Sequence, residues 1–271
     1  MKASSTLIFG IALAIFAGTC ILACEEGSSP GSSRLSESDT TLLHNDSSGV
    51  ERVGTMSQSF PDSVHGNPLI SPLEQSLRDA GLVNVQDIDP TIRVDLAYST
   101  EDNFLHTDVY GDLRRCYLQP EVAQMAAKAS ACLLTKDAKL RLIIFDGVRP
   151  RSVQYKMWDI VKGTDQQEYV AAPSGGGGLH NYGVAIDLGL YHVDTGLVDM
   201  GTPFDYFGEL AQPRFETRFV KEGLLSQQQL DNRRALRACM LEAGFAGILS
   251  EWWHFNAFPK EIARQKYKIV E

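Results

Sequence analysis

The segment GVAIDLGLYHV, residues 183 to 193, constrains the fold most, because it carries a carboxylate inside an otherwise apolar run. Its pattern predicts a buried strand. A buried carboxylate without a partner would take up a proton, so a metal ion or an arginine is expected beside Asp187. The preceding residues SGGGGLHNY contain His180, seven positions before Asp187. This stretch is therefore either a surface loop with a chance histidine or the sharply bending rim of a metal site.

Helical and strand-like patterns alternate along the chain from about Pro72 onward. Helical spacing and end signals predict helices over residues 71–82, 119–137, 151–161 and 226–244. Strand patterns cover residues 91–98, 139–146, 183–193 and 250–258, with a turn at 194–196 leading into a short strand near Val198. Because the strands are joined mostly by turns, we predict an α+β fold with a central, mostly antiparallel sheet and flanking helices.

The N-terminal residues indicate export. After Met1-Lys2, residues 7–22 form an apolar run that is short for a membrane span and suits a signal peptide. The sequence Ile21-Leu22-Ala23-Cys24 resembles a bacterial lipoprotein signal, which implies removal of residues 1–23 and lipid on Cys24. The chain is then expected to be exported and lipid-anchored to a bacterial envelope membrane, on its periplasmic or extracellular side. An ordinary secretory signal and a single-pass anchor are the alternatives.

Composition divides the remainder into a tether and one domain. Residues 24–68 are rich in Ser, Gly, Asp and Asn and lack a hydrophobic period, which predicts a disordered tether. Residues 69–271 are then expected to form one folded domain. The formal net charge of -9 gives no basic surface for a phosphate backbone, so we expect no nucleic-acid partner.

Three cysteines remain once Cys20 leaves with the signal and Cys24 carries lipid. They are Cys116, Cys132 and Cys239. An odd number allows at most one disulfide and leaves one thiol, and the sequence does not choose the pair.

Two histidines lie near carboxylates at spacings that suit metal chemistry. His180 precedes Asp187, and His254 follows Glu251. Two imidazoles and one carboxylate are a usual ligand set for a catalytic zinc, with water in the fourth position. A further carboxylate must then accept the proton of that water. Either spacing alone suits a loop or core histidine equally well, and His106 and His192 are expected to be structural or solvated.

Four motifs occur in a fixed order between residues 146 and 254, after the segment VDLAYSTEDNF at residues 94–104. They are Asp146-Gly-Val-Arg149-Pro150, His180-x6-Asp187, Met200-Gly-x2-Phe204-Asp205 and Glu251-Trp-Trp-His254. In this order the chain resembles the D-alanyl-D-alanine dipeptidases, a family of zinc peptidases. It is similar, more loosely, to the D,D- and L,D-carboxypeptidases with the same zinc site. The resemblance implies the zinc D,D-peptidase fold, which the hedgehog domain shares.

The resemblance also implies a role for each matching residue. It implies one zinc ion per chain, held by His180, Asp187 and His254. Glu251 would be the general base, and Arg149 would stabilise the oxyanion. Asp205 would bind the free ammonium group of a dipeptide. Tyr98 and Asp146 would belong to the substrate pocket, as its wall and as support behind it.

One position departs from the family pattern. The family usually carries a serine two residues before the first zinc histidine, and this chain has Gly178 there. The run Gly175 to Gly178 is therefore either a mobile lip over the pocket or a backbone nest that binds the substrate carboxylate.

The predicted activity is hydrolysis of D-Ala-D-Ala or a related short dipeptide at the cell envelope. One alternative is a D,D- or L,D-carboxypeptidase that trims peptidoglycan stem peptides. Asp205 favours the dipeptidase, because a carboxylate for a free N-terminus would repel an extended substrate. Another alternative is a non-catalytic, zinc-containing lipoprotein that binds wall peptides. Glu251 and Arg149 oppose it, since a binding protein needs neither.

Overall fold

The computed structural model describes residues 69–271 of the chain. The expectations for the signal peptide, for Cys24 and for the tether lie outside the described residues. Within residues 69–271, no helix combines the length and the apolar character that crossing a membrane requires.

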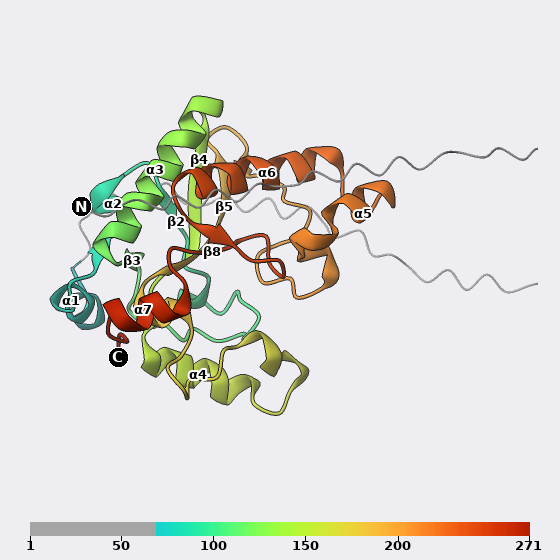
Figure 1. The fold of residues 1–271 in the computed structure, drawn as a ribbon. Helices are drawn as coiled ribbons and strands as arrows, with labels where there is room; N and C mark the ends of the chain where they lie inside the picture. Colours follow the sequence, from blue (N-terminus) through green and yellow to red (C-terminus); the bar gives the residue numbers. More distant parts are fainter. Residues whose placement is uncertain (1–68) are drawn as a thin grey trace, which may run out of the picture. The chain divides into compact units, whose positions relative to one another are not determined.

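A mixed sheet lies at the centre of the described domain (Figure 1). Its strand order is β2-β4-β5-β8-β7, and β6 pairs with the C-terminal end of β5. The bounds are β2 (Arg93–Val94), β4 (Leu140–Asp146), β5 (Ala185–His192), β6 (Gly196–Leu197), β7 (Ala246–Gly247) and β8 (His254–Asn256). The strand β2 runs parallel to β4, and the other pairings are antiparallel. The predicted α+β class with a mostly antiparallel sheet is confirmed.

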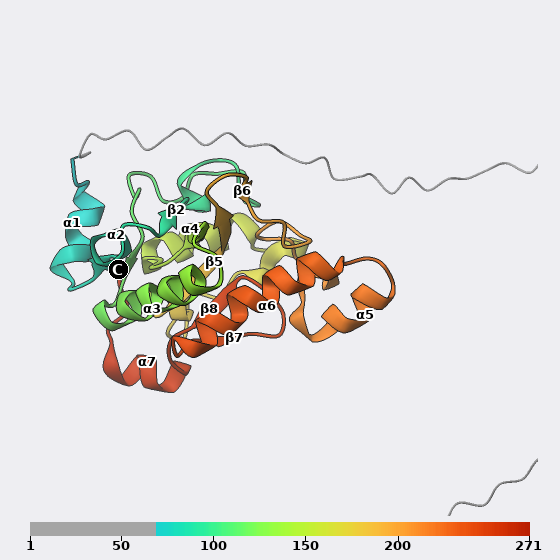
Figure 2. The ribbon, with the colours of Figure 1, turned by 90° about the horizontal axis from the view of Figure 1, so that it is seen from above.

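The described domain contains the α-helices α1 (Pro72–Asp79), α2 (Val85–Ile88), α3 (Pro120–Lys136), α4 (Arg151–Val161), α5 (Glu216–Lys221), α6 (Gln227–Glu242) and α7 (Lys260–Lys266). Of these, α3 and α6 make the main contacts with the strands of the sheet. A small antiparallel pair, β1 (Val83–Asn84) and β3 (Tyr117–Leu118), lies near α1 and α2. Figure 2 shows α3 and α6 side by side along the sheet. A disulfide between Cys132 and Cys239 joins these two helices, and Cys116 remains a buried free thiol.

Local signals explain where the main helices begin. Ser71 accepts the backbone N–H of Glu74 and Ser226 accepts that of Gln229, and both pairs form capping boxes. Pro120 occupies the first turn of α3, where its missing N–H costs nothing. These signals lie within a few residues of the helix ends, so the four predicted helices are found within a few residues of their expected bounds.

Two predicted strands are wrong in length. The strand expected over residues 91–98 is limited to Arg93–Val94, because the Tyr98 carbonyl instead accepts the backbone N–H groups of Val109 and Tyr110. The strand expected over 250–258 is limited to His254–Asn256, the three residues that pair with β5.

The strand register sets up the functional end of the sheet. Asp146 of β4 lies opposite Asp187 of β5, which in turn lies opposite His254 of β8. A register shift between Ile144 and Asp146 marks the end of β4. The chain then turns into α4, which lies beyond this end of the sheet (Figure 1). Three polar side chains therefore come together at one end of the three central strands.

Candidate active site

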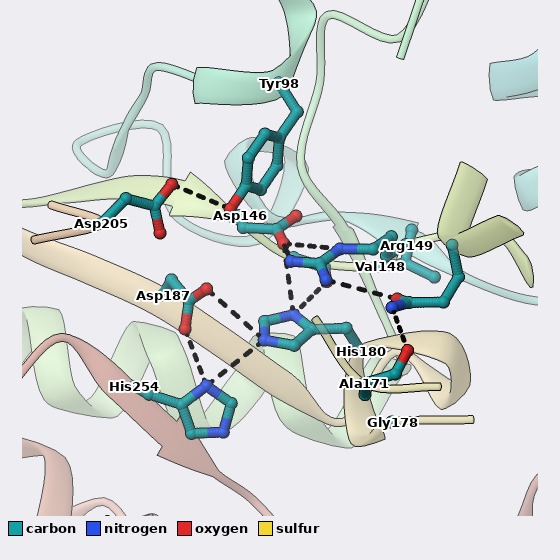
Figure 3. Close-up of polar contacts among 12 residues, drawn as sticks. Tyr98, Asp146, Val148, Arg149, Ala171, Gly178, His180, Asp187, Asp205 and His254 are labelled. Atoms are coloured by element: carbon teal, nitrogen blue, oxygen red, sulfur yellow. Dashed lines mark hydrogen bonds and ion pairs between the residues drawn. The ribbon is translucent and has the colours of Figure 1, made fainter. Parts of the chain in front are cut away.

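His180, Asp187 and His254 form a compact set of potential metal ligands (Figure 3). One ligand atom from each lies within 4.8 Å of the others. His254 Nδ1 is 2.8 Å from Asp187 Oδ1 and 3.3 Å from His180 Nε2. His180 comes from the short 3-10 turn Leu179–Tyr182 that precedes β5, and the other two come from paired strands.

The second nitrogen of each imidazole is engaged by an oxygen that can only accept. His180 Nδ1 donates to the backbone carbonyl of Gly147 at 2.8 Å, and His254 Nε2 donates to Asn256 Oδ1 at 2.8 Å. These bonds orient the two rings so that His180 Nε2 and His254 Nδ1 face Asp187 and each other. Carbonyl partners of this kind are typical of metal-ligating histidines. The donor set therefore fits a divalent metal ion.

The charges of the cluster are strongly coupled. Burial opposes ionisation of Asp187, but the adjacent His180 and His254 hold the pKa of this carboxyl far below its usual range. Burial likewise opposes a charge on His254, yet Asp187 and the hydrogen bond to it raise the pKa of His254 to about 9. The site thus presents an ionised carboxylate that needs a positive partner, as the sequence predicted for Asp187.

Arg149 is buried and fixed beside the cluster. Its Nε and a terminal nitrogen donate to Asp146 Oδ2, the former at 3.1 Å, and its other terminal nitrogen donates to Gln154 Oε1 at 3.3 Å. The Tyr110 hydroxyl donates to the second oxygen of Asp146. The guanidinium also lies over the ring of Tyr98, 5.1 Å from its centroid. Arg149 is therefore held in one orientation from three sides.

Asp205 occupies an unusual backbone conformation. Its φ is 58°, which few residues other than glycine adopt. Its Oδ2 accepts the Tyr98 hydroxyl at 2.9 Å. Burial and the nearby Asp187 raise the pKa of Asp205 well above its ordinary value. Strained, desolvated carboxylates of this kind are typical of functional sites.

These groups share one cavity of about 160 Å³. Glu251 lines it too, and burial together with Asp187 raises the pKa of this carboxyl. The polar lining consists of Tyr98, Arg149, His180, Asp187, Asp205, Glu251 and His254. Aromatic and aliphatic side chains complete the wall, among them Phe104, Met157, Val170, Phe207 and Trp253.

The glycine run forms a hydrogen-bonded turn beside this cavity. Gly175, Gly176 and Gly177 all have positive φ, from 60° to 97°. The carbonyl of Gly175 accepts Arg264 at 2.5 Å, and that of Gly176 accepts the Tyr182 hydroxyl at 2.9 Å. The N–H of Gly178 donates to Asn181 Oδ1 at 2.8 Å, so this donor is already used.

The structure brings together every site residue that the sequence singled out in the described domain. Asp146 lies behind Arg149 and outside the cavity lining, in the supporting position expected for it. Sequence reasoning missed three supporting residues, namely Tyr110, Gln154 and Asn256. Asn256 had a signal, since it lies two residues beyond His254 in a strand and shares its face.

Comparisons with known proteins identify one family. A family model described as D-ala-D-ala dipeptidase matches residues 78–270. The chain is 32% identical over 197 residues to the D-alanyl-D-alanine dipeptidase of Enterococcus faecium, with 65% of this chain and 91% of that protein covered. It is 30% identical over 175 residues to the enzyme of that name in Escherichia coli strain K12, with 65% and 83% covered. A Streptomyces coelicolor protein of that name is 31% identical over 191 residues, with 64% and 89% covered.

Proposed function

The chain belongs to the peptidase M15 family of D-Ala-D-Ala dipeptidases, which are metallopeptidases, and we propose that it hydrolyses D-Ala-D-Ala or a closely related dipeptide at the cell envelope. The observation that carries this proposal is the shared cavity. The potential metal ligands, a free carboxylate, a fixed guanidinium and the Asp205–Tyr98 pair all line one small space.

Zinc is the proposed metal, with His180, Asp187 and His254 as its ligands. Two imidazoles and one carboxylate are the ligand set of many catalytic zinc sites. When bound, zinc would polarise the peptide carbonyl and lower the pKa of a water molecule to about 7.

Glu251 and Arg149 supply the remaining catalytic groups in this proposal. Glu251 lines the cavity and has no assigned ligand role, so it accepts the proton of the attacking water and returns a proton to the leaving amine. Its raised pKa brings this carboxyl closer to the pH at which such transfers are efficient. Arg149 holds positive charge at a fixed place beside the carbonyl oxygen, where negative charge develops.

Asp205 selects a dipeptide over a longer peptide. It accepts the Tyr98 hydroxyl, and its remaining oxygen positions are available for the ammonium group of an N-terminal residue. An extended peptide has an uncharged amide there, which leaves a desolvated carboxylate without its counter-charge. The cavity volume of about 160 Å³ also lies below the ~300–1,000 Å³ of pockets for drug-sized ligands.

The disulfide supports the proposed location at the cell envelope. Cys132 and Cys239 are joined between α3 and α6, and such bonds persist in oxidising compartments outside the cytoplasm. This agrees with an exported, lipid-anchored enzyme whose Cys24 carries the anchor.

The function is tested with zinc-loaded protein against D-Ala-D-Ala, L-Ala-L-Ala and a stem pentapeptide ending in D-Ala-D-Ala. We expect cleavage of D-Ala-D-Ala by the wild type. Glu251→Gln should lower kcat by about 10²–10⁴-fold while zinc content, measured by elemental analysis, stays at one per chain. Cleavage of the pentapeptide alone would establish the carboxypeptidase instead, and zinc binding without cleavage of any peptide would establish the non-catalytic alternative.

A further inference from the structure

Arg233 is an arginine of α6 that is almost completely buried, with 1% of its surface exposed. Its Nε donates to the carbonyl of Met200 at 2.6 Å, and one terminal nitrogen donates to the carbonyl of Leu210 at 3.0 Å. Its charge is balanced by Glu216, whose carboxylate lies 3.6 Å away. The Arg233 side chain therefore binds the backbone at Met200 and at Leu210, ten residues further along the chain.

The segment between these two points carries Asp205. Because backbone carbonyls at residues 200 and 210 are both fixed to Arg233, the intervening loop has fixed ends. Its interior contains Asp205 with a φ of 58°, a conformation that persists only when the surroundings impose it. Arg233 thus holds both ends of the loop in which Asp205 has this conformation.

Other residues of α6 hold the same loop at its start. Asn232 Nδ2 donates to the carbonyl of Asp199 at 2.8 Å, and Gln229 Nε2 donates to the Asp199 carboxylate at 2.8 Å. Gly201 has a φ of +86°, and a Cβ there would lie 2.3 Å from Leu225 Cδ1. The beginning of the loop is accordingly packed closely against the region around the N-terminal half of α6.

Arg233 also contacts the segment that carries Glu251. Its guanidinium carbon is 5.8 Å from the ring centroid of Trp252, and the indole N–H of Trp252 donates to Thr202 Oγ1 at 2.8 Å. The next residue, Trp253, packs edge-to-face on Phe204, the neighbour of Asp205. Arg233 therefore lies where the Asp205 loop meets the Glu251–His254 segment.

We propose that Arg233 is a positioning residue for substrate recognition, which fixes Asp205 where it meets the ammonium group of the dipeptide. This inference rests on the proposed function, because it assigns a support to the substrate contact of that same site. An arginine suits the position, since its planar guanidinium directs several donors at separate acceptors. A lysine has a single nitrogen and would not reproduce both carbonyl bonds in the same geometry.

The test is a double-mutant cycle on kcat/KM for D-Ala-D-Ala, using Arg233→Gln, Asp205→Asn and the double variant, all zinc-loaded. If Arg233 acts through Asp205, Arg233→Gln should lower kcat/KM by about ten- to hundredfold, as for lost hydrogen bonds to a charged group. In the Asp205→Asn background the same change should lower kcat/KM by less than about threefold, because coupled residues are not additive. Zinc content should be unchanged throughout.

Arg237→Gln is the matched control. Arg237 lies on the same helix and donates to the same Glu216 at 2.7 Å, but no bond joins it to the carbonyls of Met200 or Leu210. It should retain wild-type kcat/KM. An equal loss from Arg233→Gln in both backgrounds, or no loss in either, would overturn the positioning role. A wild type without dipeptidase activity would instead overturn the proposed function.

Asn232→Ala is a second, milder variant of α6 that tests the same proposal if Arg233→Gln does not fold. It removes a solvent-exposed hydrogen bond to the same loop, so it should produce a smaller loss of kcat/KM that again disappears in the Asp205→Asn background. An equal loss in both backgrounds would show that α6 does not act through Asp205.

Discussion

At the scale of single residues, the orientation of each histidine proposed as a metal ligand depends on one acceptor. Asn256 Oδ1 accepts His254 Nε2–H at 2.8 Å and so keeps Nδ1 free for a metal. We predict that Asn256→Ala weakens zinc binding by about 10–100-fold, as is typical for loss of an outer partner of a ligand. Competition with a chelator measures the affinity. His192→Ala is the control, because His192 lies on β5 outside the cavity and should leave the affinity unchanged.

The raised pKa of Asp205 has a consequence for stability. A carboxyl group whose pKa is higher in the folded than in the unfolded state binds more protons when folded, so stability falls as pH rises through that range. Because burial and Asp187 raise the pKa of Asp205, the ionised group destabilises the metal-free fold. We predict that metal-free Asp205→Asn unfolds at a higher temperature than wild type at pH 8. The difference should shrink toward pH 4, and thermal unfolding at both pH values measures it. A wild type that is the more stable protein at pH 8 would contradict this account.

The sequence could identify those site residues whose chemistry does not suit their local environment. Asp187 lies in a buried strand, so a partner for its charge was expected. In the structure His180 and His254 lie beside it. Tyr110 and Gln154 give no such signal. Their contacts with Asp146 and Arg149 arise only when a loop and a helix fold against the end of β4.

At the scale of helices and strands, local sequence signals predicted the helix ends correctly, but the strand patterns did not predict the strand lengths. The capping box at Ser226 and the proline at the start of α3 mark helix ends within the sequence itself. The lengths of β2 and β8 depend on their partners, since β2 pairs with β4 over two residues and β8 pairs with β5 over three. Strand extent therefore follows from contacts distant in sequence, which a single segment does not encode.

The disulfide between α3 and α6 closes a loop with a sequence separation of 107 residues. In the chain-entropy description, a bond closing a loop of this size stabilises the fold by about 4–5 kcal/mol. We predict that Cys132→Ala together with Cys239→Ala lowers the free energy of unfolding by several kcal/mol, as measured by denaturant titration. A reductant should destabilise the wild type similarly. It should have no effect on the double variant, and an equal effect on both would implicate another thiol.

At the scale of the whole molecule, the site is assembled from segments that are far apart in the sequence. Phe104 and Phe207 come from separate loops and Tyr169 from a short 3-10 helix, yet the Phe207 ring packs against both other rings. All three line the cavity that holds the potential metal ligands. The order of the motifs was sufficient to predict a common cavity. The packing of its aromatic wall was not, because it depends on how the loops fold over the sheet.

The proposed anchorage is a property of the whole chain and is tested in cells. If Cys24 carries lipid, Cys24→Ala should move the protein from the membrane fraction to the soluble fraction and abolish incorporation of labelled palmitate. Cys20→Ala is the matched control, because Cys20 lies in the apolar run that is cleaved off if residues 1–23 are a signal peptide. It should leave both palmitate labelling and membrane association unchanged. Membrane association of Cys24→Ala without labelling would instead identify residues 7–22 as an uncleaved anchor, and labelling that persists in Cys24→Ala would exclude Cys24 as the lipid site.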